Sequence, residues 1–227
     1  MSTATLYRLS GFALVSGAIL AALSSVVSGV VFPDSSDPAA ATNPLNVLLG
    51  LVGVVGTMLA LLGLPGMYAR AAREGGLVWL VGVILIAFTG MLFGIFMGLL
   101  GALVFPVLAS RAPDLFGQGP PPSLFPLFII GTLANVFGGI LMGIPMITKQ
   151  VYPRWCGYMM LVEAVLAVLS FFVNGPGPSS LIAQILNDVS ALPLFLVLGW
   201  AGYELWAGKA AASGLAPSSV VAQPAGA

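Results

Sequence analysis

The amino-acid sequence predicts an all-α protein, a polytopic transmembrane helix bundle with six spans. Of its 227 residues, 59% are hydrophobic and only 6% are charged, and the mean hydropathy is +1.09. A soluble domain carries about 25% charged residues. Residues 75–110 contain no charge, and a run of roughly 20 apolar residues already crosses a bilayer. The predicted spans are residues 9–32, 45–67, 77–108, 124–147, 155–173 and 181–206.

The first span, residues 9–32, follows Arg8 and is long enough to cross the hydrocarbon core. A cleaved signal peptide is the alternative, because a basic residue followed by an apolar core also describes such a peptide. The apolar run is longer than a usual signal core, which favours the transmembrane interpretation.

The third span, residues 77–108, is the predicted centre of the bundle. Gly90, Gly94 and Gly98 recur every four residues, which places them on one face of a helix and lets a neighbouring backbone approach closely. Pro106 is expected to break the far end of this helix.

Polar or Gly/Pro-rich segments separate the spans, as the chemistry of turns requires. Residues 1–206 are therefore predicted to form a single transmembrane domain. Residues 207–227 are rich in Ala, Ser, Gly and Pro, have nothing to bury, and are expected to form a disordered cytoplasmic tail. The predicted connections are residues 33–44, 68–76, 110–123, 148–154 and 174–180.

The basic residues predict the orientation, because cytoplasmic loops carry an excess of Lys and Arg. Six spans place both termini and two of the turns on one side of the membrane. That side carries six basic residues and the opposite side carries only Arg111, so both termini are expected in the cytoplasm and the protein in the cell inner membrane. The six basic residues are Arg8, Arg70, Arg73, Lys149, Arg154 and Lys209.

Two short turns carry a family resemblance. The turn Val151-Tyr152-Pro153-Arg154-Trp155 is followed by an apolar helix, and the turn Gly66-Met67-Tyr68-Ala69-Arg70 is similar in character. The pair resembles turns of an uncharacterised family of bacterial membrane proteins with about six helices. This resemblance implies a multi-pass membrane protein and assigns no activity, so no functional residue carries over.

Composition excludes several classes of chemistry. The sequence contains no histidine, which removes the Ser-His and Cys-His nucleophile pairs and the usual zinc, copper and haem sites. Cys156 is the only cysteine, so no intrachain disulfide is possible. The net charge of zero offers no basic patch for nucleic acid. We therefore expect neither an enzyme nor a cofactor.

Glu163 is the main candidate for a functional residue inside the membrane. It lies eight positions into the fifth span, about 12 Å from the inner end. A charged side chain at such a depth costs about 2.5–3.5 kcal/mol, so we expect the neutral, protonated form. An intramembrane carboxyl is either functional or a hydrogen-bonding link to another helix, and the sequence favours neither.

Asn135 and Asp188 complete the candidate polar site. Asn135 lies near the middle of the fourth span, where one amide commonly links two helices. Asp188 is either inside the sixth span or a cap at the outer surface, and the cap is favoured because residues 188–206 are nearly long enough to span alone. In the fourth span Gly139 and Gly143 form a second predicted packing pair.

Two functions from different classes are compatible with these observations. The first is a structural or accessory helix bundle whose partners are the lipid bilayer and other membrane proteins or further copies of the chain. The second is a small proton-coupled carrier that uses Glu163 together with Asn135 and Asp188. The carrier needs a polar cavity that joins these side chains, whereas the accessory bundle does not.

Overall fold

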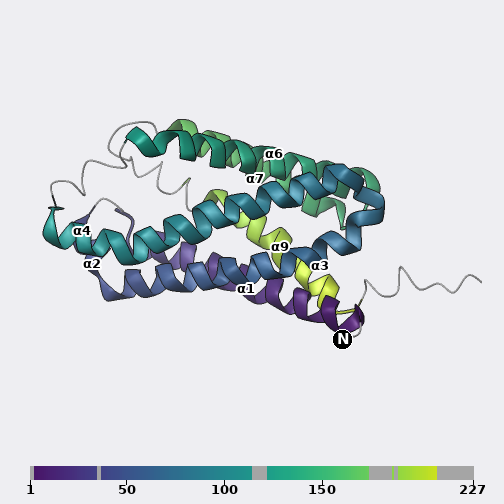
Figure 1. Cartoon of the computed structure of the whole chain (residues 1–227), viewed down its shortest axis with the longest axis horizontal. Coiled ribbons are helices and arrows are strands. Elements are labelled where there is room, and N and C mark those ends of the chain that lie inside the picture. The colour runs from purple at the N-terminus through teal and green to yellow at the C-terminus, as the bar shows by residue number, and fades with distance from the viewer. Residues whose placement is uncertain (1–2, 35–36, 114–121, 174–185, 187–188, 209–227) are drawn as a thin grey trace, which may run out of the picture.

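The computed structural model describes residues 3–34, 37–113, 122–173, 186 and 189–208, and within these ranges the chain is helical, without strands (Figure 1). Four helices are long and apolar enough to cross a membrane. These are α1 (Thr3–Val31), the continuous run Pro44–Arg111, α6 (Phe125–Lys149) and α7 (Arg154–Val173). A shorter apolar helix, α9 (Leu192–Trp206), follows.

The run 44–111 is a helical hairpin with its bend at Gly76. The long helix α3 (Pro44–Thr89) has helical backbone angles except at Gly76, where φ is 56° and ψ is −146°. The positive φ favours glycine, because residues with a side chain rarely adopt it, although a Cβ at Gly76 would meet no neighbouring group within 4 Å. The chain reverses direction at this point, so the arms before and after Gly76 run back along one another (Figure 1).

The second arm contains two π-helical stretches, η1 (Gly90–Met97) and η2 (Leu100–Val104), and ends in α4 (Phe105–Arg111). The predicted α-helix over 77–108 is thus interrupted by wider turns. The expectation that Pro106 breaks this helix is wrong, because α4 continues to Arg111. Pro106 lies in the first turn of α4, where a missing N–H is tolerated.

The predicted turn at 68–76 is also wrong in its extent. The helix continues through Arg70 and Arg73 and leaves helical geometry only at Gly76. Ala, Arg and Glu dominate positions 69–74 and are good helix formers. Charge in this stretch therefore marks the end of the apolar run, whereas the helix itself extends further.

The second arm packs on the first through its glycines. Gly90 lies against Leu61, Gly94 against Thr57, and Gly98 against Val54. The order of contacts is antiparallel, as the bend at Gly76 requires. The face bearing the three glycines therefore faces the other arm of the hairpin.

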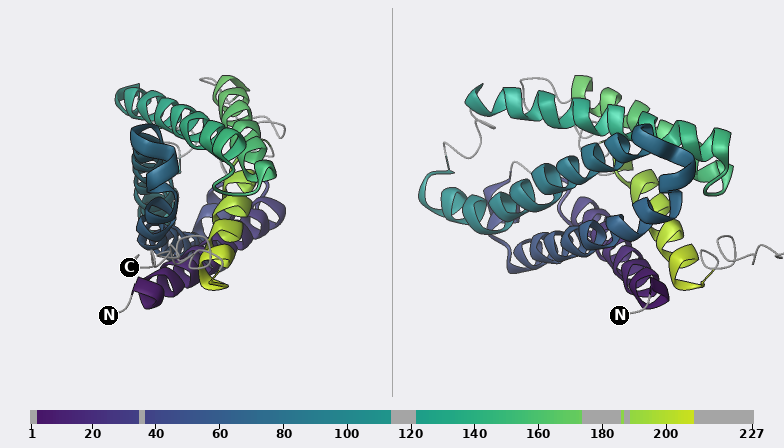
Figure 2. Two further views of the ribbon diagram at one scale, coloured as in Figure 1. Left: turned by 90° about the vertical axis from the view of Figure 1, so that its right-hand side faces the viewer. Right: turned by 45° about the vertical axis from the view of Figure 1, so that its right-hand side comes forward.

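Three further contacts bring glycines of different helices together and arrange the remaining elements. α1 crosses the first arm of α3 where Gly17 meets Gly56, and it crosses α9 where Gly11 meets Gly202. α6 crosses α7 where Gly143 meets Gly157. Figure 2 shows α6 and α7 side by side on one side of the bundle, with α1 and α9 on the other.

The connections are short within the described residues. Asp37 caps α2 (Pro38–Thr42), a single helical turn inside the predicted loop 33–44. The 3₁₀ turn η3 (Pro122–Leu124) leads into α6. The sixth predicted span begins at residue 181, but the described helix begins only at Leu192. Most of 181–188 lies outside the described residues, as does the predicted tail 207–227 apart from its first two residues.

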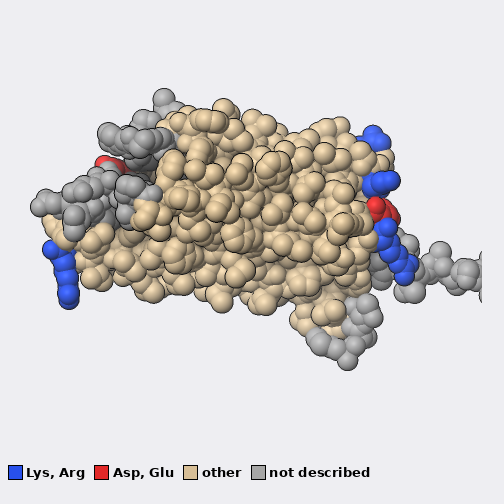
Figure 3. Space-filling view, turned by 45° about the horizontal axis from the view of Figure 1, so that its top comes forward, with Lys and Arg blue, Asp and Glu red and all other residues tan. Residues whose placement is uncertain are grey.

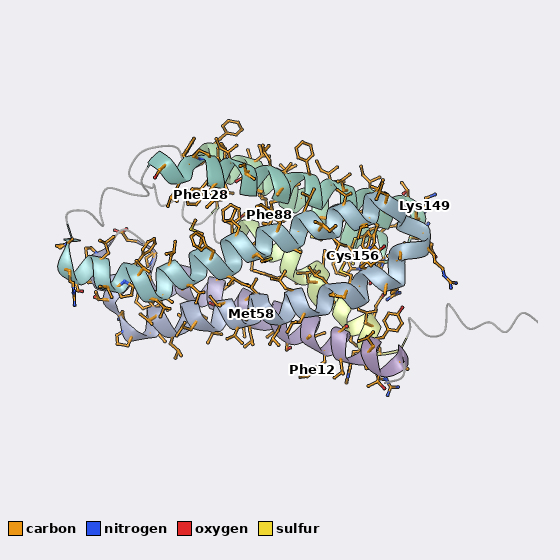
Figure 4. All side chains as sticks on the ribbon, in the orientation of Figure 1. Phe12, Met58, Phe88, Phe128, Lys149 and Cys156 are labelled. Carbon is orange, nitrogen blue, oxygen red and sulfur yellow. The ribbon has the colours of Figure 1, made fainter. Side chains whose placement is uncertain are left out.

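Charged side chains lie at the two ends of the bundle, and the visible face between them is uncharged (Figure 3). The bend of α3, the α6–α7 turn and the start of α1 share one end, whereas α4 ends at the other (Figure 1). Lys149 and Cys156 both lie at the first of these ends (Figure 4). The charged side chains seen on this face are thus confined to the ends of the helices.

The contact at Gly94 generates a stability prediction. A Cβ at this position would lie 2.5 Å from the Thr57 side chain, so Gly94→Leu should separate the arms and lower stability by about 1–3 kcal/mol. The measurement is thermal unfolding of the purified protein in detergent. Gly101→Leu is the matched control, because a Cβ at Gly101 meets nothing within 4 Å. Unfolding of the Gly94 variant at the parental temperature would contradict this packing.

Candidate functional site

The crossing of α6 and α7 positions the main candidate residues. Gly143 and Gly157 let the two backbones touch, since a Cβ on either would meet the carbonyl oxygen of the other within 3 Å. One turn earlier on α6, Gly139 lies directly against the carboxyl group of Glu163. The small residues of α6 therefore create the space that the Glu163 side chain occupies.

Glu163 is buried between these helices, with 2% of its surface exposed. The amide nitrogen Nδ2 of Asn135, on α6, donates a hydrogen bond to Oε1 of Glu163, on α7. The structure thus brings together two of the three predicted polar residues. Asp188 lies outside the described residues.

Two polar atoms of this pair have no hydrogen-bond partner among the described residues. They are Oε2 of Glu163 and Oδ1 of Asn135, and both are buried. A neutral carboxyl group can donate one hydrogen bond and accept others, whereas a carboxylate can only accept. The pair can therefore link two helices, and it can also hold a proton.

A second buried polar cluster lies at the end of the bundle where the α3 bend is found. Nη1 of Arg70, in α3, lies 2.6 Å from Oε2 of Glu204, in α9. Nε1 of Trp200 donates a hydrogen bond of 3.0 Å to Oε1 of the same carboxylate. The side chains of Arg70 and Glu204 are only 15% and 8% exposed. This ion pair therefore fastens α9 to α3.

The turn between α6 and α7 joins the same cluster through Tyr152. The guanidinium carbon of Arg70 lies 4.6 Å from the centre of the Tyr152 ring. The Trp79 ring stacks on the same Tyr152 ring, with 6.2 Å between the two ring centres. Burial raises the pKa of the Tyr152 phenol above its ordinary value, although Arg70 opposes this shift. Tyr152 is therefore a neutral ring that packs the two turns together.

Glu204 is the residue that sequence reasoning missed. Its place near the inner end of the last span suggests a solvated side chain or one near Lys209, but only 6% of its surface is exposed. The sequence does hold a signal for the pair, because the acidic Glu204 and the basic Arg70 are both predicted near the inner ends of their spans. Pairing them requires knowing that α9 packs against α3.

The described residues contain no group of three His, Cys, Asp or Glu side chains that could hold a metal ion. Cys156 is a buried free thiol at the start of α7. The architecture is that of an all-helical protein with several helices long and apolar enough to cross a membrane. No family model, curated protein or solved structure matches this chain.

The Arg70–Glu204 pair generates a second stability prediction. Glu204→Leu leaves the buried guanidinium group without its counter-ion, and removing one partner of a buried pair costs about 3–5 kcal/mol. Replacing both residues, as Arg70→Met with Glu204→Leu, removes the uncompensated charge and should recover most of the loss. The measurement is the free energy of unfolding in detergent.

Arg73→Met is the matched control, because Arg73 lies in the same helix but its side chain is exposed. It should unfold like the parent protein. A Glu204→Leu variant as stable as the parent would show that the ion pair does not hold α9 in place.

Proposed function

We propose that this protein is a multi-pass protein of the cell inner membrane with six spans and both termini in the cytoplasm. Two spans arise from the hairpin at Gly76, since each of its arms has more than the roughly 20 residues that a crossing needs. The packing of α1 on α3 and α9 favours an integral first span over a cleaved signal peptide. We take α9 as part of the sixth span.

The distribution of charge supports this orientation. The α3 bend, the α6–α7 turn and the start of α1 carry five of the described basic residues, and they share one end of the bundle. Arg111 lies at the opposite end, where α4 stops. A cytoplasmic location of the more basic end follows from the known bias of Lys and Arg.

Reporter fusions test the topology. A fusion at Gly75 and one at Lys209 should both report the cytoplasm, whereas a fusion at Gly119 should report the outside. The physical reason is the retention of Lys- and Arg-rich turns on the cytoplasmic side. A periplasmic signal at Lys209 would contradict six spans, and a mature N-terminus beyond residue 20 would establish a cleaved signal peptide.

We propose a structural or accessory role for this bundle, with other membrane proteins or further copies of the chain as partners. One observation carries the proposal: the Glu163 carboxyl group is sealed between α6 and α7 and bonded to Asn135. Arg70 and Glu204 likewise pair with each other inside the protein. These groups are used in contacts between helices, which is how polar residues join helices in a membrane.

A proton-coupled carrier is the second candidate, and one observation favours it. Oε2 of Glu163 and Oδ1 of Asn135 are buried without a partner among the described residues. Polar groups that remain unpaired in hydrocarbon are costly and commonly mark proton pathways. In a carrier the Glu163 carboxyl would gain and lose a proton, with the Asn135 oxygen available as a hydrogen-bond acceptor, whereas in an accessory bundle both groups would only join the helices.

Two substitutions of Glu163 separate the candidates. Glu163→Gln preserves the shape and the acceptor oxygen but cannot exchange a proton, so stability should remain near that of the parent. Glu163→Leu leaves the Asn135 amide without its partner and should lower the free energy of unfolding by about 1–3 kcal/mol. The measurements are unfolding in detergent and proton flux in liposomes that contain the purified protein.

An accessory bundle shows no proton flux above empty liposomes in the parent or in either variant. Flux in the parent that is lost in Glu163→Gln, at unchanged stability, would instead establish the carrier. If neither variant changes stability or flux, Glu163 is not sealed between α6 and α7 and the accessory proposal loses its main support.

A further inference from the structure

The two charged turns at one end of the bundle are held together by a buried aromatic stack. Trp79 lies just after the α3 bend and stacks on Tyr152 of the α6–α7 turn. Both rings are buried, with 0% and 1% of their surfaces exposed. Arg70 covers the Tyr152 ring from the helix before the bend. Basic residues that are far apart in the sequence therefore share one end of the protein.

The basic residues of these turns fall into two groups. Arg70 is internal, and its charge is balanced by Glu204. The side chains of Arg73, Lys149 and Arg154 are exposed, and none forms an ion pair within the described part of the chain. Figure 3 shows the Lys and Arg side chains of this end in blue, close together, with a small red acidic group among them.

One exposed carboxylate, Glu74, shares this end with the three cations. The three exposed cations outnumber this carboxylate, so the surface that they form carries a net positive charge. Trp155 follows Arg154 directly and is 38% exposed, and exposed tryptophan rings sit at the level of the lipid headgroups. The cations are thus next to a marker of the membrane interface, at the depth where lipid phosphates lie.

We propose that the two joined turns form a docking surface for the phosphate groups of anionic lipids, with Arg73, Lys149 and Arg154 as the binding cations. The inference rests on the proposed placement of the helices in a membrane. Arg and Lys both bind phosphate, and a cation near an anionic membrane surface favours binding roughly fivefold. The stack of Trp79 on Tyr152 is the element that keeps the cations together.

Native tryptophans provide the test, because Trp155, Trp200 and Trp206 are exposed near this end. The full chain is reconstituted into vesicles of phosphatidylcholine and phosphatidylglycerol, with bromine atoms on the acyl chains of one lipid at a time. Brominated lipid quenches tryptophan on contact, so quenching measures which lipid lies beside this end. The parent should be quenched more strongly by brominated phosphatidylglycerol.

The variant that combines Arg73→Gln, Lys149→Gln and Arg154→Gln should lose this preference, and each single replacement should reduce it by up to about fivefold. Arg111→Gln is the matched control at the opposite end of the bundle, and it should keep the parental preference. Equal quenching of the parent by both lipids would overturn the inference, as would a preference that survives the triple replacement.

Failure of the membrane placement gives a different result. If neither brominated lipid quenches the tryptophans, these rings do not lie in a bilayer and the proposed topology fails together with the lipid surface. If both lipids quench equally, the helices are in the bilayer and only the preference for anionic lipid is absent. Circular dichroism of each variant in the same vesicles establishes that the comparison is made between folded proteins.

Discussion

The structure depends on the approach of bare backbones at helix crossings. Lipid chains are as apolar as leucine, so helices in a bilayer gain no hydrophobic stabilisation from touching one another and must associate through close packing and hydrogen bonds. Here glycine meets glycine where α1 crosses α3, where α1 crosses α9 and where α6 crosses α7. These crossings order the helices around the bundle. A side chain at any of them would push the backbones apart and remove most of the contacts around it.

The same constraint decides where polar groups can be placed. Gly139 makes room for Glu163, and the close crossing one turn away holds Asn135 of α6 within reach of that carboxyl. A polar group inside a membrane is tolerated when a neighbouring helix supplies its partner. The glycine crossing therefore permits the Asn135–Glu163 hydrogen bond, which adds a directional contact to the close packing of the two helices.

Much of the helical architecture could be predicted from the sequence, because apolar runs and glycine spacing are local properties. The polar residues Asn135 and Glu163 were identifiable in the same way, since each interrupts an apolar span. Their pairing was not, because it depends on which faces of α6 and α7 meet. The pairing of Arg70 with Glu204 joins helices that are distant in sequence. Local reasoning also misjudged Pro106, whose effect depends on its position within the first turn of a helix.

The basic residues at one end of the bundle are divided between the interior of the protein and its surface. At the end that holds the α3 bend, Arg70 is drawn inside by Glu204 and by the Tyr152 ring. Arg73, Lys149 and Arg154 form no ion pair within the described residues, and their side chains are exposed. Tyr152 contacts both Arg70 and Trp79, so the α6–α7 turn packs against residues on both sides of the α3 bend. Packing inside the protein and charge on its surface are thus linked through a single turn.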